Sequence, residues 1–338
     1  MKFKGIEICC PGCKGELAYF GIEDSLLLCQ ECGKGFPIIL DIPDLRVFSD
    51  PYVDMEADRD KGIKIYAKFD DYDFEGLIDY YYRITPVVTD DQAQQFKQGL
   101  MAGEARANAF LKSFNNGMKF NNEVKRESLL EIGCGTAPLL VAASERYKRA
   151  IGIDIAFRWL IVGKKRLQET NLDIPLICAC SEALPFPDSV FTDVVAESTI
   201  EHVVDQTKTF SECYRVILPG GNLLLSTPNK YSIGPDPHTG VIAGGYLPES
   251  WTASYIERQG GIPPKRNLLT VRSLQALLRQ SKFVFKDLKI PNLSQEQIQH
   301  YEGAFKFLAQ LYRMIIKLPL SKWIMLRIGP LILAIARK

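Results

Sequence analysis

The stretch Leu-Leu-Glu-Ile-Gly-Cys-Gly-Thr-Ala at residues 129–137 decides the fold. Its first four residues predict a buried strand, its glycines predict a sharp turn, and Pro138 suits the first turn of a following helix. A dinucleotide-binding fingerprint would need Gly or Ala three positions after the second glycine, where this chain has Pro138. The stretch therefore predicts a strand, loop and helix, and it disfavours dinucleotide binding.

Strand-like apolar runs alternate with helical patterns after this loop. The runs that we expect to form strands are 129–132, 150–153, 175–177, 190–196, 223–226, 283–290 and 331–336. Such alternation is typical of a parallel sheet with crossover helices. We therefore expect an α/β fold with a doubly wound sheet.

Composition limits the class of protein. A chain of 338 residues exceeds the usual size of one domain. With 46% hydrophobic and 24% charged residues it is typical of globular proteins, which excludes wholesale disorder. Lys and Arg number 41 against 40 Asp and Glu, so the net charge of +1 provides no general attraction to nucleic acid. We expect a sizeable core and no nucleic-acid partner.

Three units are expected along the chain. Residues 1–48 are predicted to form a small cysteine-rich ribbon, 49–126 a helical connector or cap with an acidic first half, and 127–338 the α/β domain. Within the last unit, the glycine- and proline-rich segment 229–269 predicts a lid, and 294–326 predicts a helical insertion.

Location is predicted from apolar runs and cysteines. The amino terminus offers no apolar stretch of signal-peptide length, and the longest uncharged apolar run near the carboxyl end, 328–336, is too short to cross a bilayer. Five of the nine cysteines crowd into the first 32 residues, which suits metal chemistry in a reducing compartment. The cytoplasm is the expected location, with a peripheral contact at the inner membrane face considered below.

A cysteine quartet stands near the amino terminus. Cys10 and Cys13 are separated by fifteen residues from Cys29 and Cys32, which is the spacing of a structural zinc site. Four thiolates would complete a tetrahedral shell around Zn²⁺ and leave no position for water. The alternative is a set of buried or redox-active cysteines.

The residues around the quartet extend this prediction. With its CPxC and CxxCG motifs, and Phe-Pro-Ile at 36–38 followed by Ile-Pro-Asp-Leu at 42–45, the segment resembles the zinc ribbons of small activator proteins that bind tRNA and translation-factor methyltransferases. The resemblance implies a docking module, which here would dock in cis on the chain's own catalytic domain. The family usually has glycine where this chain has Asp41, which affects the expected turn but not the metal ligands.

Further motifs follow the glycine loop. Glu131 precedes the loop, Asp154 ends the next expected strand, and Leu-Pro-Phe-Pro-Asp stands at 184–188. With these motifs, residues 127–338 resemble class I methyltransferases dependent on S-adenosylmethionine, the large type 11 group. The resemblance implies a Rossmann-like sheet of seven strands with the last one antiparallel, and S-adenosylmethionine as cofactor.

The resemblance also implies the cofactor site. The two loop glycines would let the backbone approach the methionine and ribose portion, and Asp154 would accept hydrogen bonds from both ribose hydroxyls. Ile155 would pack on adenine. Because Cys180 replaces the family's adenine-binding aspartate, one of the next two side chains or a backbone carbonyl would take that role. The expected cofactor-binding residues are Glu131, Gly133, Gly135, Asp154, Ile155, Ser181, Glu182 and Glu197.

Methyl transfer from a sulfonium requires alignment of the nucleophile and exclusion of water rather than a metal. If the acceptor is a hydroxyl, a base helps, and His202 at the carboxyl edge of the sheet is the expected catalytic residue. The alternative is that His202 only orients the following helix. His238 in the expected lid is a second candidate base.

The carboxyl-terminal segment 306–338 carries seven basic residues and no acid. Leu308 and Leu311 share an apolar helical face, whereas Lys306 and Lys317 lie on another. This pattern suits an interfacial helix on anionic lipid, so peripheral membrane contact through 306–338 is a hypothesis. The alternative is an ordinary amphipathic helix packed on the core.

The sequence thus favours an S-adenosylmethionine-dependent methyltransferase with a small-molecule or lipid-linked acceptor, and O- or C-methylation over N-methylation. A zinc ribbon before a methyltransferase also resembles the guanine-N1 methyltransferases of large ribosomal RNA, so an rRNA or tRNA base methyltransferase is an alternative, opposed by the near-neutral charge. A non-catalytic scaffold that binds a partner through the ribbon is the other alternative. The intact glycine loop and Asp154 argue against it.

Overall fold

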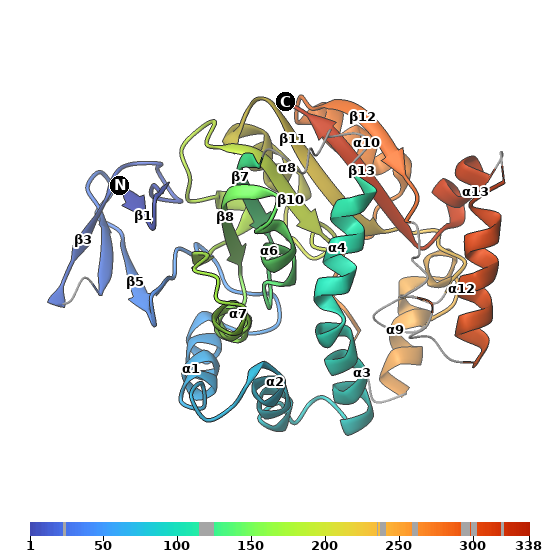
Figure 1. Ribbon diagram of the computed structural model, residues 1–338, viewed down its shortest axis with the longest axis horizontal. Coiled ribbons are helices and arrows are strands. Elements are labelled where there is room, and N and C mark those ends of the chain that lie inside the picture. The colour runs from blue at the N-terminus through green and yellow to red at the C-terminus, as the bar shows by residue number, and fades with distance from the viewer. Residues whose placement is uncertain are drawn as a thin grey trace.

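The computed structural model describes the chain apart from residues 23–24, 115–124, 235, 237–240, 259–262, 292–297, 299–302 and 319–320. Its centre is a seven-stranded sheet in the order β12-β13-β11-β10-β7-β8-β9, with helices on both faces (Figure 1). β13 runs antiparallel to both of its neighbours, and the other pairs in the sheet are parallel. The predicted fold class, a doubly wound Rossmann-like sheet of seven strands with the last one antiparallel, is confirmed.

The strands match the expected apolar runs. Their bounds are β7 (Arg126–Ile132), β8 (Tyr147–Asp154), β9 (Leu176–Cys178), β10 (Phe191–Glu197), β11 (Ile217–Pro228), β12 (Val284–Lys289) and β13 (Leu331–Arg337). The largest difference is at β11, which begins six residues before the expected 223–226. After the buried Ile217, residues 218–220 are exposed and include Gly220 at a φ of +81°, so this part of the strand lacks an apolar pattern. The Gly220 amide still donates to the Lys338 carbonyl at 3.0 Å.

Two layers of helices cover the sheet. Successive strand residues point to opposite faces, so Leu129 and Leu130 belong to different core clusters. The cluster around Leu129 is packed by α1 (Met55–Tyr66), α2 (Phe74–Arg83), α4 (Gly103–Ser113), α6 (Pro138–Ala143) and α7 (Phe157–Glu169), next to the exposed α3 (Asp90–Met101). The other cluster is packed by α8 (Gln206–Val216) and α10 (Val271–Gln280). Pro138 begins α6 as expected, and Thr270 caps α10.

The amino-terminal segment forms small sheets at one end of the molecule (Figure 1). It contains β1 (Lys2–Phe3), β2 (Ile6–Glu7), β3 (Leu17–Phe20), β4 (Leu26–Cys29), β5 (Gly35–Ile39) and β6 (Ile42–Pro43). Leu40 and Asp41 connect β5 to β6 with φ values of 54° and 61°. Such a two-residue hairpin turn needs positive φ at both positions, and aspartate tolerates this conformation well. A turn is therefore present at Asp41.

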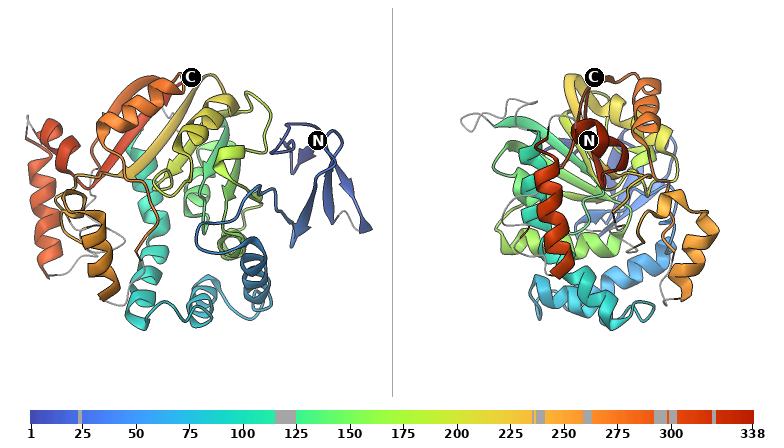
Figure 2. Two further views of the ribbon diagram at one scale, coloured as in Figure 1. Left: turned by 180° about the vertical axis from the view of Figure 1, so that it is seen from behind. Right: turned by 90° about the vertical axis from the view of Figure 1, so that its right-hand side faces the viewer.

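A group of helices lies at the opposite end (Figures 1 and 2). It comprises η3 (Gly244–Tyr246) and α9 (Glu249–Arg258) within the expected lid, and α12 (Gly303–Ile315) and α13 (Ser321–Ile328), which overlap the expected insertion. Parts of both segments lie outside the described residues. Within the described residues, no helix has the length and apolarity needed to cross a bilayer.

Candidate active site

The glycine loop after β7 is shaped by a close approach to the loop after β10. Gly133 has a φ of +72°, and its amide donates to the Ile153 carbonyl at 2.8 Å. A Cβ at this position would lie 2.3 Å from Oγ1 of Thr199. Because a side chain would meet both backbone strain and a clash, only glycine fits here. The loop therefore presents bare backbone at the carboxyl edge of the sheet.

Asp154 at the end of β8 is held by backbone amides. Its Oδ2 accepts a hydrogen bond from the Gly135 amide and its Oδ1 from the Ala156 amide, both at 2.8 Å. Removal from bulk water raises the pKa of this carboxyl to about 6, although the two amide hydrogen bonds act in the opposite direction. The carboxylate is thus fixed in orientation beside the glycine loop.

These residues border a cavity of about 310 Å³, a size that suits a small ligand. The cavity brings together six of the predicted site residues, namely Gly133, Asp154, Ile155, Ser181, Glu182 and His202. The other predicted residues, Glu131, Gly135 and Glu197, do not line it. Gly135 is nevertheless joined to the site through its hydrogen bond to Asp154.

Two further carboxyls lie close to this edge of the sheet. Glu131 is 3% exposed, and its Oε2 has no hydrogen-bond partner among the described residues. Burial, and then the neighbouring carboxylates of Glu197 and Asp154, raises the pKa of Glu131 well above its ordinary value. Nε of Arg106, in α4, lies 3.4 Å from Glu197. A buried carboxyl oxygen without a hydrogen-bond partner, close to other carboxylates, is suited to bind a cationic group.

The adenine side of the site differs from the family pattern that the sequence resembles. Cys180 does not line the cavity, and its thiol instead donates to the Phe48 carbonyl at 3.5 Å. Ser181 and Glu182 do line the cavity. One oxygen of Glu182 accepts from the Val204 amide at 2.8 Å and the other from the Ser181 hydroxyl at 3.0 Å. Glu182 therefore ties two cavity-lining loops together.

His202 lines the cavity with a partly exposed side chain, next to a buried acid. Oε2 of Glu201 accepts from the Thr227 hydroxyl at 3.0 Å, and Oε1 lies 4.0 Å from Nε2 of His202. Burial raises the pKa of Glu201 to about 7. The sequence did not single out Glu201, because an acid next to a histidine has no distinctive spacing. His238 lies outside the described residues.

The sequence also missed one wall of the cavity, which is formed by residues at the junction of the expected ribbon and the expected connector. Phe48, Asp50, Pro51 and Tyr52 face the glycine loop across this space. Tyr52 is linked to the lid segment, since its hydroxyl oxygen accepts from the Lys265 amide at 2.7 Å. The contact joins residues 48–52 to the lid segment, which is far away in sequence. No local sequence motif predicts such a contact.

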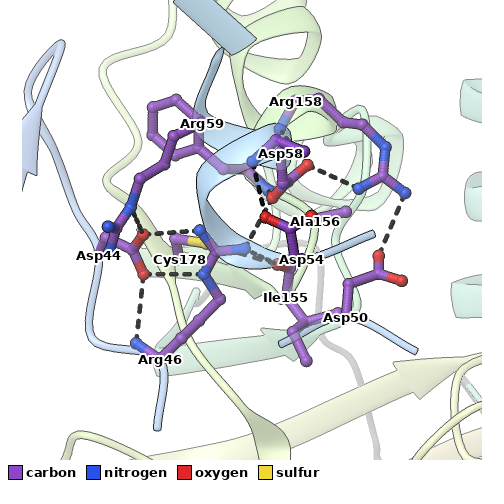
Figure 3. A network of polar contacts seen from close by, with 12 residues as sticks. Asp44, Arg46, Asp50, Asp54, Asp58, Arg59, Ile155, Ala156, Arg158 and Cys178 are labelled. Atoms are coloured by element: carbon purple, nitrogen blue, oxygen red, sulfur yellow. Dashed lines mark hydrogen bonds and ion pairs between the residues drawn. The ribbon is translucent and has the colours of Figure 1, made fainter. Parts of the chain in front are cut away.

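A buried ionic network fixes this wall against the loop after β8 (Figure 3). Asp58, fully buried in α1, accepts from the Phe157 amide at 2.7 Å and from Nη1 of Arg158 at 2.6 Å. Asp58 thereby caps α7, whose own N-cap residue makes no side-chain hydrogen bond. Arg46 donates through Nη1 to Asp58 at 2.7 Å and to the Ile155 carbonyl at 3.0 Å. The network therefore holds the residues that directly follow Asp154.

Asp44 and Asp50 complete this network at its two ends. Burial alone would raise the pKa of Asp44, but hydrogen bonds from Arg46 and Arg59 hold it below its ordinary value. At the other end, Asp50 pairs with Nη2 of Arg158 at 3.1 Å. Acidic side chains in such a segment are normally exposed to solvent, but here they form buried ion pairs with buried arginines.

The four ribbon cysteines converge, as their spacing predicts. The Sγ atoms of Cys10 and Cys32 are 3.7 Å apart, those of Cys13 and Cys29 are 3.5 Å apart, and all four lie within 4.8 Å of one another. A regular tetrahedron of thiolates about 2.3 Å from Zn²⁺ has edges of about 3.8 Å. The donor set and its size therefore fit zinc. Across the described part of the chain, no other such group of potential metal ligands is found.

The ribbon segment contacts the edge of the large sheet. Nζ of Lys14 lies 2.9 Å from Oε2 of Glu212 in α8 and donates to the Leu184 carbonyl at 2.9 Å. The Leu45 amide donates to the Cys178 carbonyl in β9 at 2.7 Å. Leu45 stands between Asp44 and Arg46, so the end of the ribbon segment continues directly into the ionic network.

Part of the chain is similar to known methyltransferases. Residues 130–225 match a family whose description is "Methyltransferase domain". A Mycolicibacterium smegmatis protein named "Probable S-adenosylmethionine-dependent methyltransferase" is 35% identical over 111 residues, which cover 33% of this chain and 42% of that protein. A demethylmenaquinone methyltransferase of Geobacillus sp. is 32% identical over 122 residues, which cover 35% of this chain and 52% of that protein. The resemblance to class I methyltransferases is confirmed, whereas the chain spans about half the length of these relatives.

Among solved structures, geranyl diphosphate C-methyltransferase of Streptomyces coelicolor matches with a TM-score of 0.45 and 17% identity. The match covers 69% of this chain and 75% of that protein. These values are too low to carry an argument about function.

Proposed function

We propose that the chain is an S-adenosylmethionine-dependent methyltransferase that acts on a small-molecule or lipid-linked acceptor, with O- or C-methylation favoured over N-methylation. The observation that carries the proposal is the carboxylate of Asp154, fixed by two backbone amides at a cavity beside a loop without side chains. Its neighbourhood lies within the segment that matches the methyltransferase family. S-adenosylmethionine would supply the methyl group on a cationic sulfonium.

The residues of the chain bind and orient the cofactor in this proposal. Asp154 accepts hydrogen bonds from the two vicinal ribose hydroxyls, since a carboxylate offers paired acceptors. The bare backbone at Gly133 and Gly135 makes room for the ribose and methionine portion. Ile155, Ser181 and Glu182 border the adenine side of the cavity.

The amino-acid end of the cofactor fits the charged groups next to the cavity. The orphaned oxygen of Glu131 and the carboxylate of Glu197 would accept hydrogen bonds from a cationic amine. Arg106 would face the carboxylate of the same ligand, because its side chain reaches Glu197 from α4 and is half exposed. An amine and a carboxylate on one carbon require such neighbouring charges of opposite sign.

His202 is proposed as the base when the acceptor is a hydroxyl. Its side chain lines the cavity and would accept the acceptor's proton as the oxygen attacks the methyl carbon. We expect His202→Ala to retain cofactor affinity and to lose about 10²-fold or more in turnover. Steady-state rates with the identified acceptor measure this. Unaltered turnover would assign His202 to positioning the loop before α8 instead.

The proposed function is tested by calorimetric titration of the full chain with S-adenosylmethionine and with S-adenosylhomocysteine. We expect saturable binding of one molecule per chain for both ligands. NAD serves as the matched control, since Pro138 replaces the third position of the dinucleotide fingerprint. Absence of binding by both sulfur ligands would overturn the assignment as a methyltransferase and would favour a scaffold.

We propose further that the cysteine quartet binds one structural Zn²⁺ and that the resulting ribbon docks in cis on the large sheet. We expect about one zinc per chain in the purified protein, and loss of that zinc in Cys13→Ser, as measured by elemental analysis. The same substitution should lower the melting temperature by several degrees, because the ribbon tail continues into the buried network. Cys9→Ala is the matched control, and zinc loss in that variant would contradict the assignment of the four ligands.

A further inference from the structure

The helices α9, α12 and α13 lie at the end of the molecule opposite the ribbon, and each carries exposed apolar side chains (Figure 2). We call the outer sides of α9, α12 and α13 the distal surface. Two of the three tryptophans of the chain lie on it, Trp251 at 67% and Trp323 at 64% exposure. Phe307 and Met314 in α12, and Tyr255 in α9, are also more than half exposed. Exposed large apolar side chains on neighbouring helices are typical of a surface that contacts another phase or molecule.

Few residues of α9 and α12 are buried in the described part of the chain. α9 buries none of its residues, although it carries Trp251 and Tyr255. In α12, Ala309 is buried, and the hydroxyl of Tyr312 donates to the Pro291 carbonyl at 2.7 Å. Phe307, Leu308, Leu311 and Met314 in the same helix are exposed. Leu308 and Leu311, which share the apolar face expected from the sequence, are 49% and 37% exposed, so the chain covers that face only in part.

Charge on the distal surface favours an anionic partner. Residues 303–338 contain no acid, and Lys306, Lys317 and Arg327 are exposed. Because α9 contains two acids, Glu249 and Glu257, the excess of basic residues lies on α12 and α13. Basic side chains among exposed aromatic and aliphatic ones are typical of surfaces that bind the interface of anionic bilayers.

An apolar cavity of about 560 Å³ opens between η3, α10 and α13. Tyr231, Tyr246 and Leu326 line it, and Arg272 and Arg327 border it. The guanidinium carbon of Arg327 lies 3.4 Å from the centre of the Trp323 ring. A guanidinium group beside an apolar cavity is suited to a lipid, because a lipid carries a phosphate next to its apolar chains.

We infer that the distal surface binds the surface of an anionic lipid bilayer. Exposed tryptophan favours this occupant, because its amphipathic ring is suited to the headgroup region. A second copy of the chain is disfavoured, because a symmetric contact through this surface would place basic residues opposite basic residues. Binding to a bilayer needs no cofactor, so this inference can be tested independently of the proposed methyltransferase activity.

Co-sedimentation with vesicles tests the inference. At low salt, we expect the full chain to bind vesicles of equal parts phosphatidylglycerol and phosphatidylcholine, and to bind pure phosphatidylcholine at least about tenfold more weakly. Lys306→Glu with Lys317→Glu should weaken binding to the anionic vesicles by at least about tenfold. The double variant Lys64→Glu with Lys112→Glu changes the net charge equally on α1 and α4, outside the three helices of the distal surface, and should bind as the wild type does.

Tryptophan fluorescence provides a second readout that identifies the surface. In Trp159→Phe the remaining tryptophans are Trp251 and Trp323, so we expect a blue shift with anionic vesicles and quenching by brominated lipid. Equal vesicle binding by both charge-reversed double variants would overturn the inference, as would an unshifted spectrum. A dimer in light scattering that dissociates in the Lys306→Glu, Lys317→Glu variant would assign the surface to a second copy.

Discussion

Asp154→Asn is expected to weaken S-adenosylmethionine binding by about 100-fold or more. The substitution keeps size and shape but removes the charge that strengthens hydrogen bonds to two hydroxyls, each worth about 1.5–3 kcal/mol to a charged acceptor. It also turns an amide N–H toward either Gly135 or Ala156, whose own N–H groups now donate to the carboxylate. Calorimetric titration of wild type and variant measures the loss.

The pH dependence of binding identifies the same group. Because the pKa of Asp154 is raised to about 6, the carboxyl is protonated below that pH and must lose its proton before it can accept from both hydroxyls. The affinity of the wild type should therefore fall by up to about tenfold per unit as the pH drops below 6, and level off above 7. The difference between wild type and Asp154→Asn isolates this contribution from those of Glu131 and Glu197, whose pKa values are also raised.

Loss of binding in this variant should not reflect unfolding. The folded-state pKa of about 6 lies above the ordinary value of 3.8, so the native state binds more protons between these values. Ionisation of Asp154 therefore opposes folding, and this cost is fully present above pH 6. The Asp154→Asn substitution removes that cost in folding free energy. This gain partly compensates for the stability lost with the two amide hydrogen bonds. A variant that binds the cofactor as tightly as wild type, with flat affinity from pH 5 to pH 8, would show that the ribose is held elsewhere.

The sequence could predict the glycine loop and Asp154 because both are local features. A strand that ends in glycines forces a turn, and the acid at the end of the next strand must reach the same edge of a parallel sheet. The convergence of Cys10, Cys13, Cys29 and Cys32 was predictable for the same reason, since each pair sits on one turn. In these cases the spacing along the chain fixes the distance in space.

The cavity wall at 48–52 and the ionic network could not be predicted in this way. The acids of that segment carry no periodic pattern, and unpaired acids in sequence normally indicate a solvated surface. Their burial depends on arginines elsewhere, such as Arg158 more than a hundred residues away from Asp50. Only the folded chain reveals that Asp58 caps a helix to which it is not joined. The segment expected to be a connector contains the helices α1 to α4, and its first residues also contribute to the cavity wall.

Asp58→Asn is expected to lower the free energy of unfolding by about 3–5 kcal/mol, the cost of removing one partner from a buried ion pair. Asp58 is fully buried and receives hydrogen bonds from Arg46, Arg158 and the Phe157 amide. In the variant, the buried guanidinium groups of Arg46 and Arg158 would lose the negative charge of Asp58 that compensates their own charge. Urea unfolding followed by circular dichroism measures the change, and the transition midpoint should shift while its slope stays constant.

Asp60→Asn is the matched control, because Asp60 is exposed in the same helix and should stay within about 0.5 kcal/mol of wild type. The folded Asp58→Asn protein should also bind S-adenosylmethionine more weakly, since the network holds the Ile155 carbonyl and the start of α7 directly after Asp154. That effect should be smaller than the loss in Asp154→Asn, because Asp58 does not line the cavity. Wild-type stability in Asp58→Asn would show that water or a shifted side chain replaces the carboxylate, and the network would then lose its role in positioning the cofactor edge.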